Sequence, residues 1–329
     1  MGACRRYPFS FYYDDNWLKQ NKRFFNYITL NDFKAWAEER RRADMMASGQ
    51  EVFFEISKEL EFLEKTTNCM EHMFNNEPRK RFQLDDPDGV ARREGKNYTQ
   101  IFMDELTKVE AVDVVQLFYD RRFGYIEDPE VDVPLSYHPR WNQIADDIAS
   151  KLQPFAAIHW RMERLEPISN LLPCAKNLVE KVQSINPEQN VNLFLLTDYP
   201  HLLNTSEPES RSFKANELKL EHHEAIRHVY QHLDVTLTTL DRPDRPVIDH
   251  ELPTSWHIYK VPPHVKPYDS GVLGIVDKLV AMRAQWFFAG EPGVCGKSSS
   301  FTNQIIDDRK AASEAGHPAI RETVNMFSL

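Results

Sequence analysis

The residues best suited to chemistry lie in the segment Phe155-Ala-Ala-Ile-His-Trp-Arg161. This apolar run predicts a short buried strand, and alternation along an extended backbone puts His159 and Arg161 on the same side. If the strand belongs to a parallel sheet, Arg161 lies at its carboxyl end, where a planar fork of donors can hold a phosphate. In the alternative interpretation, Arg161 forms a surface salt bridge and His159 bonds to a backbone carbonyl.

A second candidate is the glycine-rich segment Gly290-Glu-Pro-Gly-Val-Cys-Gly-Lys-Ser298, which lies between an expected strand and an expected helix. A P-loop has four residues between its glycines, whereas five residues separate Gly290 from Gly296. The spacing therefore does not match a P-loop. The glycines still permit close approach of the backbone, and a helix that begins near Ser299 offers amide donors and a positive dipole end to an anion.

Composition narrows the possible classes of protein. The chain has 329 residues, of which 41% are hydrophobic, and this is enough to fill a substantial core. A formal net charge of −10 argues against a nucleic-acid-binding surface. No apolar run approaches the roughly 20 residues that a membrane-spanning helix needs, so no span is predicted.

Cysteine spacing bears on metals and disulfides. Four cysteines, Cys4, Cys69, Cys174 and Cys295, lie far apart in the sequence, without the close pairing that is typical of a zinc site. No metal is predicted, and one or two long-range disulfides are possible.

From about Pro139 the pattern alternates between helices and strands, which predicts an α/β fold with a parallel sheet covered by helices. We expect strands at residues 155–160, 191–197, 235–240 and 286–289, and helices at 141–152, 173–182, 218–232, 271–285 and from about 299. Such sheets bind ligands at the carboxyl ends of their strands. Three of these ends carry suitable polar groups: His159 with Arg161, Thr197 with Asp198, and the loop after Phe288.

Residues 1–138 have a mostly helical pattern and form a separate predicted domain, followed by a second domain at 139–329. We expect helices at 31–46, 51–64 and 101–109, an exposed loop at 75–96, and a strand at 112–118.

Several of these segments together resemble the C-terminal half of the GDP-fucose protein O-fucosyltransferases. They are Ile158–Glu163, Leu195–Tyr199, Gly274–Val280, Trp286–Gly290, and Ser299–Thr302 with Arg309, and the region Pro8–Phe33 also resembles part of that family. The resemblance implies a GT-B architecture, with two facing Rossmann-like domains and the sugar nucleotide held mainly by the second. It also implies transfer of fucose from GDP-fucose to a Ser or Thr hydroxyl of a protein, with inversion and without a metal or other cofactor.

The resemblance assigns roles to individual residues. Arg161 would contact the diphosphate and stabilise the charge on the departing GDP, and His159 would shape the same pocket. Asp277 would help to hold the nucleotide. The phosphate and guanosine site would be lined by Ser299, Ser300, Phe301 and Thr302.

One departure from the family leaves alternatives open. The family has a glycine-rich loop of Gly-Gly-x-x-Asn-Gln type on its first strand, and this sequence has none before Tyr12 or elsewhere. We therefore expect the acceptor-side domain, residues 1–138, to be incomplete or degenerate. The alternatives are a non-catalytic protein that binds a GDP-sugar, and an unrelated Rossmann-type enzyme that binds a nucleotide through Gly293–Lys297. If the chain lacks its original N-terminus, the resemblance implies the lumen of the endoplasmic reticulum or Golgi, with a protein or glycan as the acceptor.

Overall fold

The computed structural model describes residues 7–23, 26–42, 51–56, 80–84, 86–108, 113–119, 136–185, 188, 190–201, 213, 217–241, 252–262 and 270–329. Contacts divide the chain into two compact units, Met1–His138 and Pro139–Leu329, which we call the N-terminal and C-terminal units. Within the described residues, no helix is long and apolar enough to cross a membrane.

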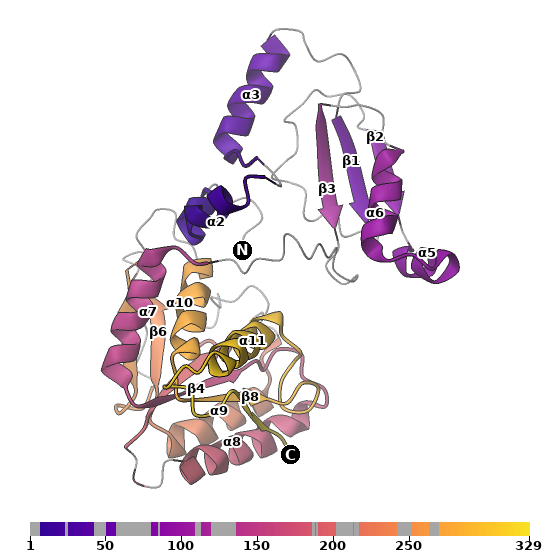
Figure 1. Ribbon diagram of the computed structural model, residues 1–329. Helices are drawn as coiled ribbons and strands as arrows, with labels where there is room; N and C mark the ends of the chain where they lie inside the picture. Colours follow the sequence, from indigo (N-terminus) through magenta and orange to yellow (C-terminus); the bar gives the residue numbers. More distant parts are fainter. Residues whose placement is uncertain are drawn as a thin grey trace. The chain divides into compact units, whose positions relative to one another are not determined.

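The N-terminal unit combines helices with a small parallel sheet (Figure 1). Its described helices are α1 (Phe9–Tyr12), α2 (Asp15–Gln20), α3 (Leu30–Arg42), α5 (Pro87–Glu94) and α6 (Tyr98–Thr107). Its described strands are β1 (Glu51–Ile56), β2 (Lys80–Leu84) and β3 (Val114–Tyr119), which pair in the order β2-β1-β3. All the pairs are parallel. The helix expected at 101–109 and the strand expected at 112–118 correspond to α6 and β3.

The helix expected at 51–64 is wrong where the structure describes it, because Glu51–Ile56 is the strand β1. Val52, Phe53 and Ile56 fit a helical spacing, but β-branched and aromatic residues also favour extended backbone. The segment forms a strand and not a helix because β1 pairs with β2 on one side and with β3 on the other. Residues 57–64 lie outside the described residues.

The loop expected at 75–96 is also wrong for residues 80–84 and 87–94, which form β2 and α5. Local signals explain α5. The Asp86 carboxylate accepts a hydrogen bond from the amide of Gly89 at 2.8 Å, Pro87 opens the helix, and Gly95 ends it with a φ of 65°. Residues 75–79 lie outside the described part of the chain.

The C-terminal unit is a six-stranded parallel sheet flanked by helices, which confirms the predicted α/β class. Its strands are β4 (Phe155–Trp160), β5 (Asn192–Thr197), β6 (Thr236–Leu240), β7 (His257–Val261), β8 (Trp286–Gly290) and β9 (Asn325–Phe327). Its described helices are α7 (Pro139–Leu152), the short 3-10 helix η1 (Ile168–Asn170), α8 (Leu171–Ile185), α9 (Leu220–His232), α10 (Ser270–Met282) and α11 (Ser300–Glu314).

Helices cover both faces of this sheet. Figure 1 shows α8 and α9 side by side on one face, and α7 and α10 side by side on the other. The central strand β4 is buried along its whole length. Burial on both faces explains why Phe155–Trp160 is a continuous apolar run with a single interruption at His159.

The strand order is β7-β6-β5-β4-β8-β9, and the side on which successive strands are added changes once along the chain. From β4 the chain adds β5, β6 and β7 on one side, and then returns to place β8 on the other side of β4. Ligands of open α/β sheets bind beyond the carboxyl ends of the strands at such a switch point. The switch point lies between β4, which ends just before Arg161, and β8, which leads into the glycine-rich segment.

Candidate functional site

His159 and the first turn of α11 meet at the carboxyl end of β4. The Nδ1 atom of His159 lies 2.8 Å from Oγ1 of Thr302, and its ring centroid lies 5.2 Å from that of Phe301. His159 is only 8% exposed. Burial, together with the positive charge of Arg161, lowers the pKa of His159 to about 4. Near neutral pH the imidazole is therefore an uncharged hydrogen-bonding group.

Arg161 lies just beyond the end of β4, in an ion-pair cluster. Its Nη2 donates to Oε1 of Glu163, and Nζ of Lys297 lies 3.7 Å from the same oxygen. The Glu163 side chain is 1% exposed, whereas those of Arg161 and Lys297 are 25% and 38% exposed. Two partly exposed cations thus converge on one buried carboxylate.

Asp198, which follows β5, fixes the backbone of the segment that carries Arg161. Its two carboxylate oxygens accept hydrogen bonds from the amides of Met162 at 2.8 Å and Glu163 at 3.0 Å. Burial raises the pKa of Asp198 to about 6, although both amide bonds oppose this shift. The neighbouring strand end predicted from the sequence therefore supports the Arg161 segment.

The glycine-rich segment after β8 folds back on itself. The amides of residues 293–297 all donate within the protein: three to the carbonyl of Glu291, one to the carbonyl of Gly296, and one to the carbonyl of Arg161. A phosphate-binding loop works through free amides that point at the ligand. This segment has none to offer between 293 and 297.

Close packing holds the same segment in place. A Cβ atom on Gly290 would lie 2.8 Å from the carbonyl oxygen of Cys295, so a larger residue would displace the turn. That carbonyl also accepts a hydrogen bond from Nε1 of Trp160 at 2.7 Å. A disulfide joins Cys174 on α8 to Cys295, which is one of the long-range pairings that the sequence left open.

The start of α11 offers the donors that the glycine-rich segment lacks. The hydroxyl of Ser299 caps the helix by accepting from the amide of Thr302 at 3.4 Å. The amides of Ser300 and Phe301 have no acceptor among the residues that the structure describes. Because the first amides of a helix lack internal partners, these two can bind an anion.

Asp277 lies on α10, and its carboxylate accepts a hydrogen bond from the hydroxyl of Thr238 in β6. In the sheet order, β6 is separated from β4 by β5. A Cβ atom on Gly274, one turn earlier in α10, would lie 4.0 Å from the Phe301 ring. The helix that carries Asp277 thus packs against the start of α11, while the Asp277 carboxylate itself is held toward β6.

The contacts therefore group His159, Phe301, Thr302 and Ser299 at the mouth of β4. Arg161 lies beside them and is tied to the glycine-rich segment. Sequence reasoning gave no role to Glu163 and named Lys297 only as the end of the Gly293–Lys297 segment of the alternative nucleotide-binding enzyme. No strand pattern could have indicated Glu163, because it lies in a turn beyond the end of β4.

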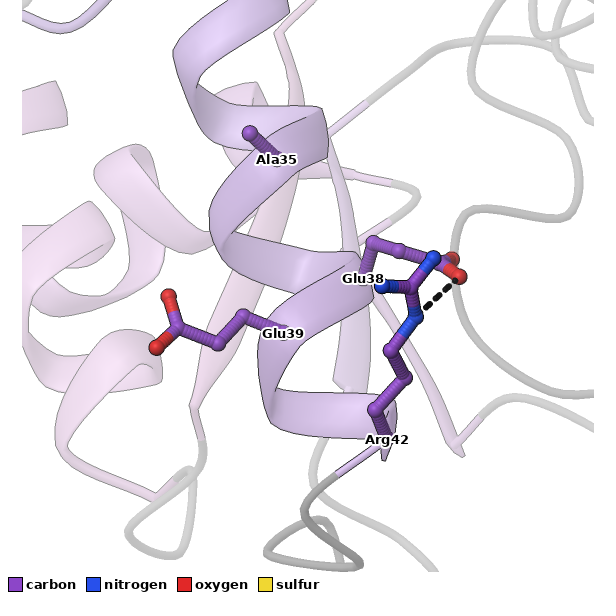
Figure 2. Close-up of a pocket in the computed structure, with 4 residues that line it drawn as sticks. All are labelled: Ala35, Glu38, Glu39 and Arg42. Atoms are coloured by element: carbon purple, nitrogen blue, oxygen red, sulfur yellow. Dashed lines mark hydrogen bonds and ion pairs between the residues drawn. The ribbon is translucent and has the colours of Figure 1, made fainter.

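A separate pocket lies along α3 in the N-terminal unit. Figure 2 shows its lining of Ala35, Glu38, Glu39 and Arg42, with Nε of Arg42 donating to Oε1 of Glu38 at 3.1 Å. All four residues come from one helix, and none belongs to the predicted site. Its lining is a solvated helix face, so we place the candidate site in the C-terminal unit.

Comparisons with known proteins give structural relatives only. No protein family and no curated protein matches the sequence. Among solved structures, the chain is similar to POFUT1 in complex with GDP-fucose, at 12% identity and a TM-score of 0.47, and to POFUT1 in complex with GDP, at 12% identity and a TM-score of 0.46. Each likeness covers 98% of this chain and 85% of the other. POFUT1 is a GDP-fucose protein O-fucosyltransferase.

Proposed function

We propose that the protein binds GDP-fucose and transfers fucose to a Ser or Thr hydroxyl of a protein acceptor, with inversion and without a metal. The observation that carries this proposal is the position of Arg161. The residue lies partly exposed at the switch point between β4 and β8, next to the segment that leads into the open amides of α11. A guanidinium and helix amides together suit a diphosphate.

The proposed chemistry needs positive groups that are already in place. When the bond from fucose to GDP breaks, negative charge develops on the departing diphosphate. Donors fixed in advance stabilise this charge without further rearrangement, and loss of one such donor commonly costs about 10²–10³ in rate. Arg161 supplies this donor in the proposal, and Asp198 keeps its backbone segment fixed.

The remaining site residues hold and shape the donor in this proposal. The uncharged His159 orients Thr302, and so the first turn of α11, through their hydrogen bond. In this proposal the phosphate and guanosine site is lined from the start of α11 by Ser299, Ser300, Phe301 and Thr302. The carboxylate of Asp277 can accept donors from the nucleotide, with the Thr238 hydroxyl fixing its orientation.

The disulfide between Cys174 and Cys295 supports the compartment that the resemblance implies. Disulfides persist in oxidising compartments and are rare in the cytosol. We therefore extend the proposal to the lumen of the endoplasmic reticulum or Golgi, where a protein or glycan acceptor would be met.

Calorimetric titration with GDP, GDP-fucose and ATP tests donor binding. We expect preference for the guanine nucleotides, with affinity reduced at least tenfold in Arg161→Ala, because a charge-assisted contact is lost. Lys310→Ala is the matched control, since it removes an exposed positive charge from α11. Tight binding of ATP, or unchanged GDP binding in Arg161→Ala, would refute the proposal.

Turnover is tested separately by GDP release from GDP-fucose with peptides that contain Ser and Thr. Release that depends on the peptide supports a transferase. Binding of GDP-fucose without any release, across a broad set of acceptors, would instead support the non-catalytic alternative.

A further inference from the structure

Lys297 contacts the segment that carries Arg161 through both its backbone and its side chain. Its amide donates to the Arg161 carbonyl at 3.2 Å, which fixes the segment after β8 against the end of β4. Its Nζ lies 3.7 Å from the Glu163 oxygen that the Arg161 guanidinium also contacts. The two cationic side chains are therefore held next to each other.

Glu163 is the group that brings these side chains together. Its carboxylate is buried, and its Oε2 atom has no hydrogen-bond partner in the part of the chain that the structure describes. A buried carboxylate is costly unless cations compensate it, so Glu163 draws both Arg161 and Lys297 inward. Removal of Glu163 would leave the two cations without this common anchor.

Both cations keep donors to spare. A guanidinium carries five N–H groups and an ammonium carries three. Among the described residues, Glu163 is the one side-chain acceptor for Arg161, and none lies within hydrogen-bond distance of the Lys297 Nζ. The remaining donors are available to a ligand at the switch point.

We propose that Lys297 is a second phosphate-binding residue, that Glu163 positions it beside Arg161, and that this pair selects a diphosphate over a single phosphate. The inference rests on the proposed function and extends it to a residue outside the predicted set. Two phosphoryl groups joined by one oxygen present two sets of charged acceptors side by side. A pair of adjacent cations matches both sets, whereas a single phosphate can engage only part of the pair.

Pyrophosphate and orthophosphate test this pair without any contribution from a base or sugar. Calorimetry on the full chain should show pyrophosphate binding at least tenfold more tightly than orthophosphate. In Lys297→Gln, pyrophosphate should bind about tenfold more weakly and orthophosphate less than threefold more weakly. Lys310→Gln, whose side chain is 68% exposed on α11, should leave both affinities unchanged.

The role of Glu163 is tested by Glu163→Gln, with thermal melting to show that the variant folds. We expect the selectivity of Glu163→Gln for pyrophosphate to fall toward that of Lys297→Gln. The double variant Glu163→Gln/Lys297→Gln should lose little more selectivity than either single variant. Equal weakening of both anions in Lys297→Gln, or unchanged pyrophosphate affinity, would overturn the inference. A folded Glu163→Gln variant with the original selectivity would overturn the positioning role.

The outcome for the proposed function is separate. Preference for GDP over ADP reports on the base, whereas selectivity for pyrophosphate reports on the cation pair. If the protein does not prefer GDP over ADP but still selects pyrophosphate, GDP-fucose is refuted as the donor and the proposed role of Lys297 stands.

Discussion

The hydroxyl of Thr302 and the imidazole of His159 form a buried link between the centre of the sheet and the start of α11. Their Oγ1 and Nδ1 atoms lie 2.8 Å apart, and both side chains are largely shielded from solvent. This contact aligns the first turn of the helix with the mouth of β4. The open amides of Ser300 and Phe301 are thereby held close to the strand end that leads into Arg161.

Thr302→Val should destabilise the protein by about 1–3 kcal/mol, because the isosteric change leaves the buried Nδ1 of His159 without a partner. Chemical denaturation measures the change in the free energy of unfolding. Thr302→Ser keeps the hydroxyl and serves as the control, so it should lose clearly less stability. Unchanged stability in Thr302→Val would contradict a stabilising role of this hydrogen bond.

Arg309 is expected to be a structural residue, although it belongs to the segment that resembles the fucosyltransferases. Its side chain is 0% exposed. Its guanidinium donates to the carbonyl oxygens of Ala281, Met282, Ala284, Gln285, Glu322 and Thr323. Burial lowers the pKa of Arg309 to about 10, so the group is still charged at neutral pH.

Arg309→Lys should therefore cost about 3 kcal/mol or more in urea denaturation, because an ammonium cannot reproduce the planar fork and leaves several carbonyls unpaired. Arg321→Lys is the matched control, since Arg321 is exposed and stacks on the Trp286 ring at 5.0 Å. Similar stability in the two variants would contradict this role of Arg309.

The Cys174–Cys295 disulfide closes a long segment, with a sequence separation of 121. Chain-entropy arguments give about 4–5 kcal/mol of stabilisation for a loop of this length. The double variant Cys174→Ser/Cys295→Ser should melt at a lower temperature than the parent. A reductant should no longer change its melting temperature through these positions. An unchanged melting temperature, with both thiols of the parent shown to be oxidised, would argue against this stabilisation.

The sequence predicted the elements whose patterns are local. The β4 segment was recognised because a central parallel strand is apolar along its whole length. The strand β9 was missed because Asn325–Phe327 is only three residues long and takes its structure from pairing with β8. The strand β7 was missed because it lies at the sheet edge, where His257–Val261 is partly exposed and lacks a continuous apolar run.

The site was predictable to a similar extent. Position at the end of a strand indicated His159 and Arg161, and the glycine-rich turn after the strand at 286–289 indicated a helix that begins near Ser299. The Glu163 contact with Lys297 joins residues far apart in the sequence. No local pattern reports such a contact, because it depends on β8 packing beside β4.

Acid should destabilise the protein below about pH 6.5. Burial lowers the pKa of His159 to about 4 and that of His201 to about 3, whereas an unfolded histidine has a pKa of 6.5. Between these values the unfolded chain binds protons that the folded chain does not, so the free energy of unfolding falls as the pH decreases. Above pH 6.5 both states are deprotonated at these residues, and their contribution to stability is fully present.

Asp198 acts in the opposite direction, because burial raises its pKa from 3.8 to about 6. As the pH falls, Asp198 binds its proton in the folded state before it does so in the unfolded state. Its contribution to the free energy of unfolding therefore grows as the pH falls from 6 toward 3.8, and is lost as the pH rises through 6. The lowered pKa values of His159 and His201 together have a larger effect on stability than the raised pKa of Asp198. We therefore expect the free energy of unfolding to drop by about 3 kcal/mol between pH 6.5 and pH 4.5.

Urea denaturation at several pH values measures this slope, and His201→Phe separates its sources. Nδ1 of His201 lies 2.7 Å from the Tyr230 hydroxyl, and the ring also contacts Tyr199 and Trp256, so phenylalanine should fit among these rings. The variant no longer has a histidine that must be kept neutral, so its stability should decline less steeply in acid than that of the parent. A parent that gains stability from pH 6.5 to pH 4.5 would show that Asp198 outweighs the two histidines.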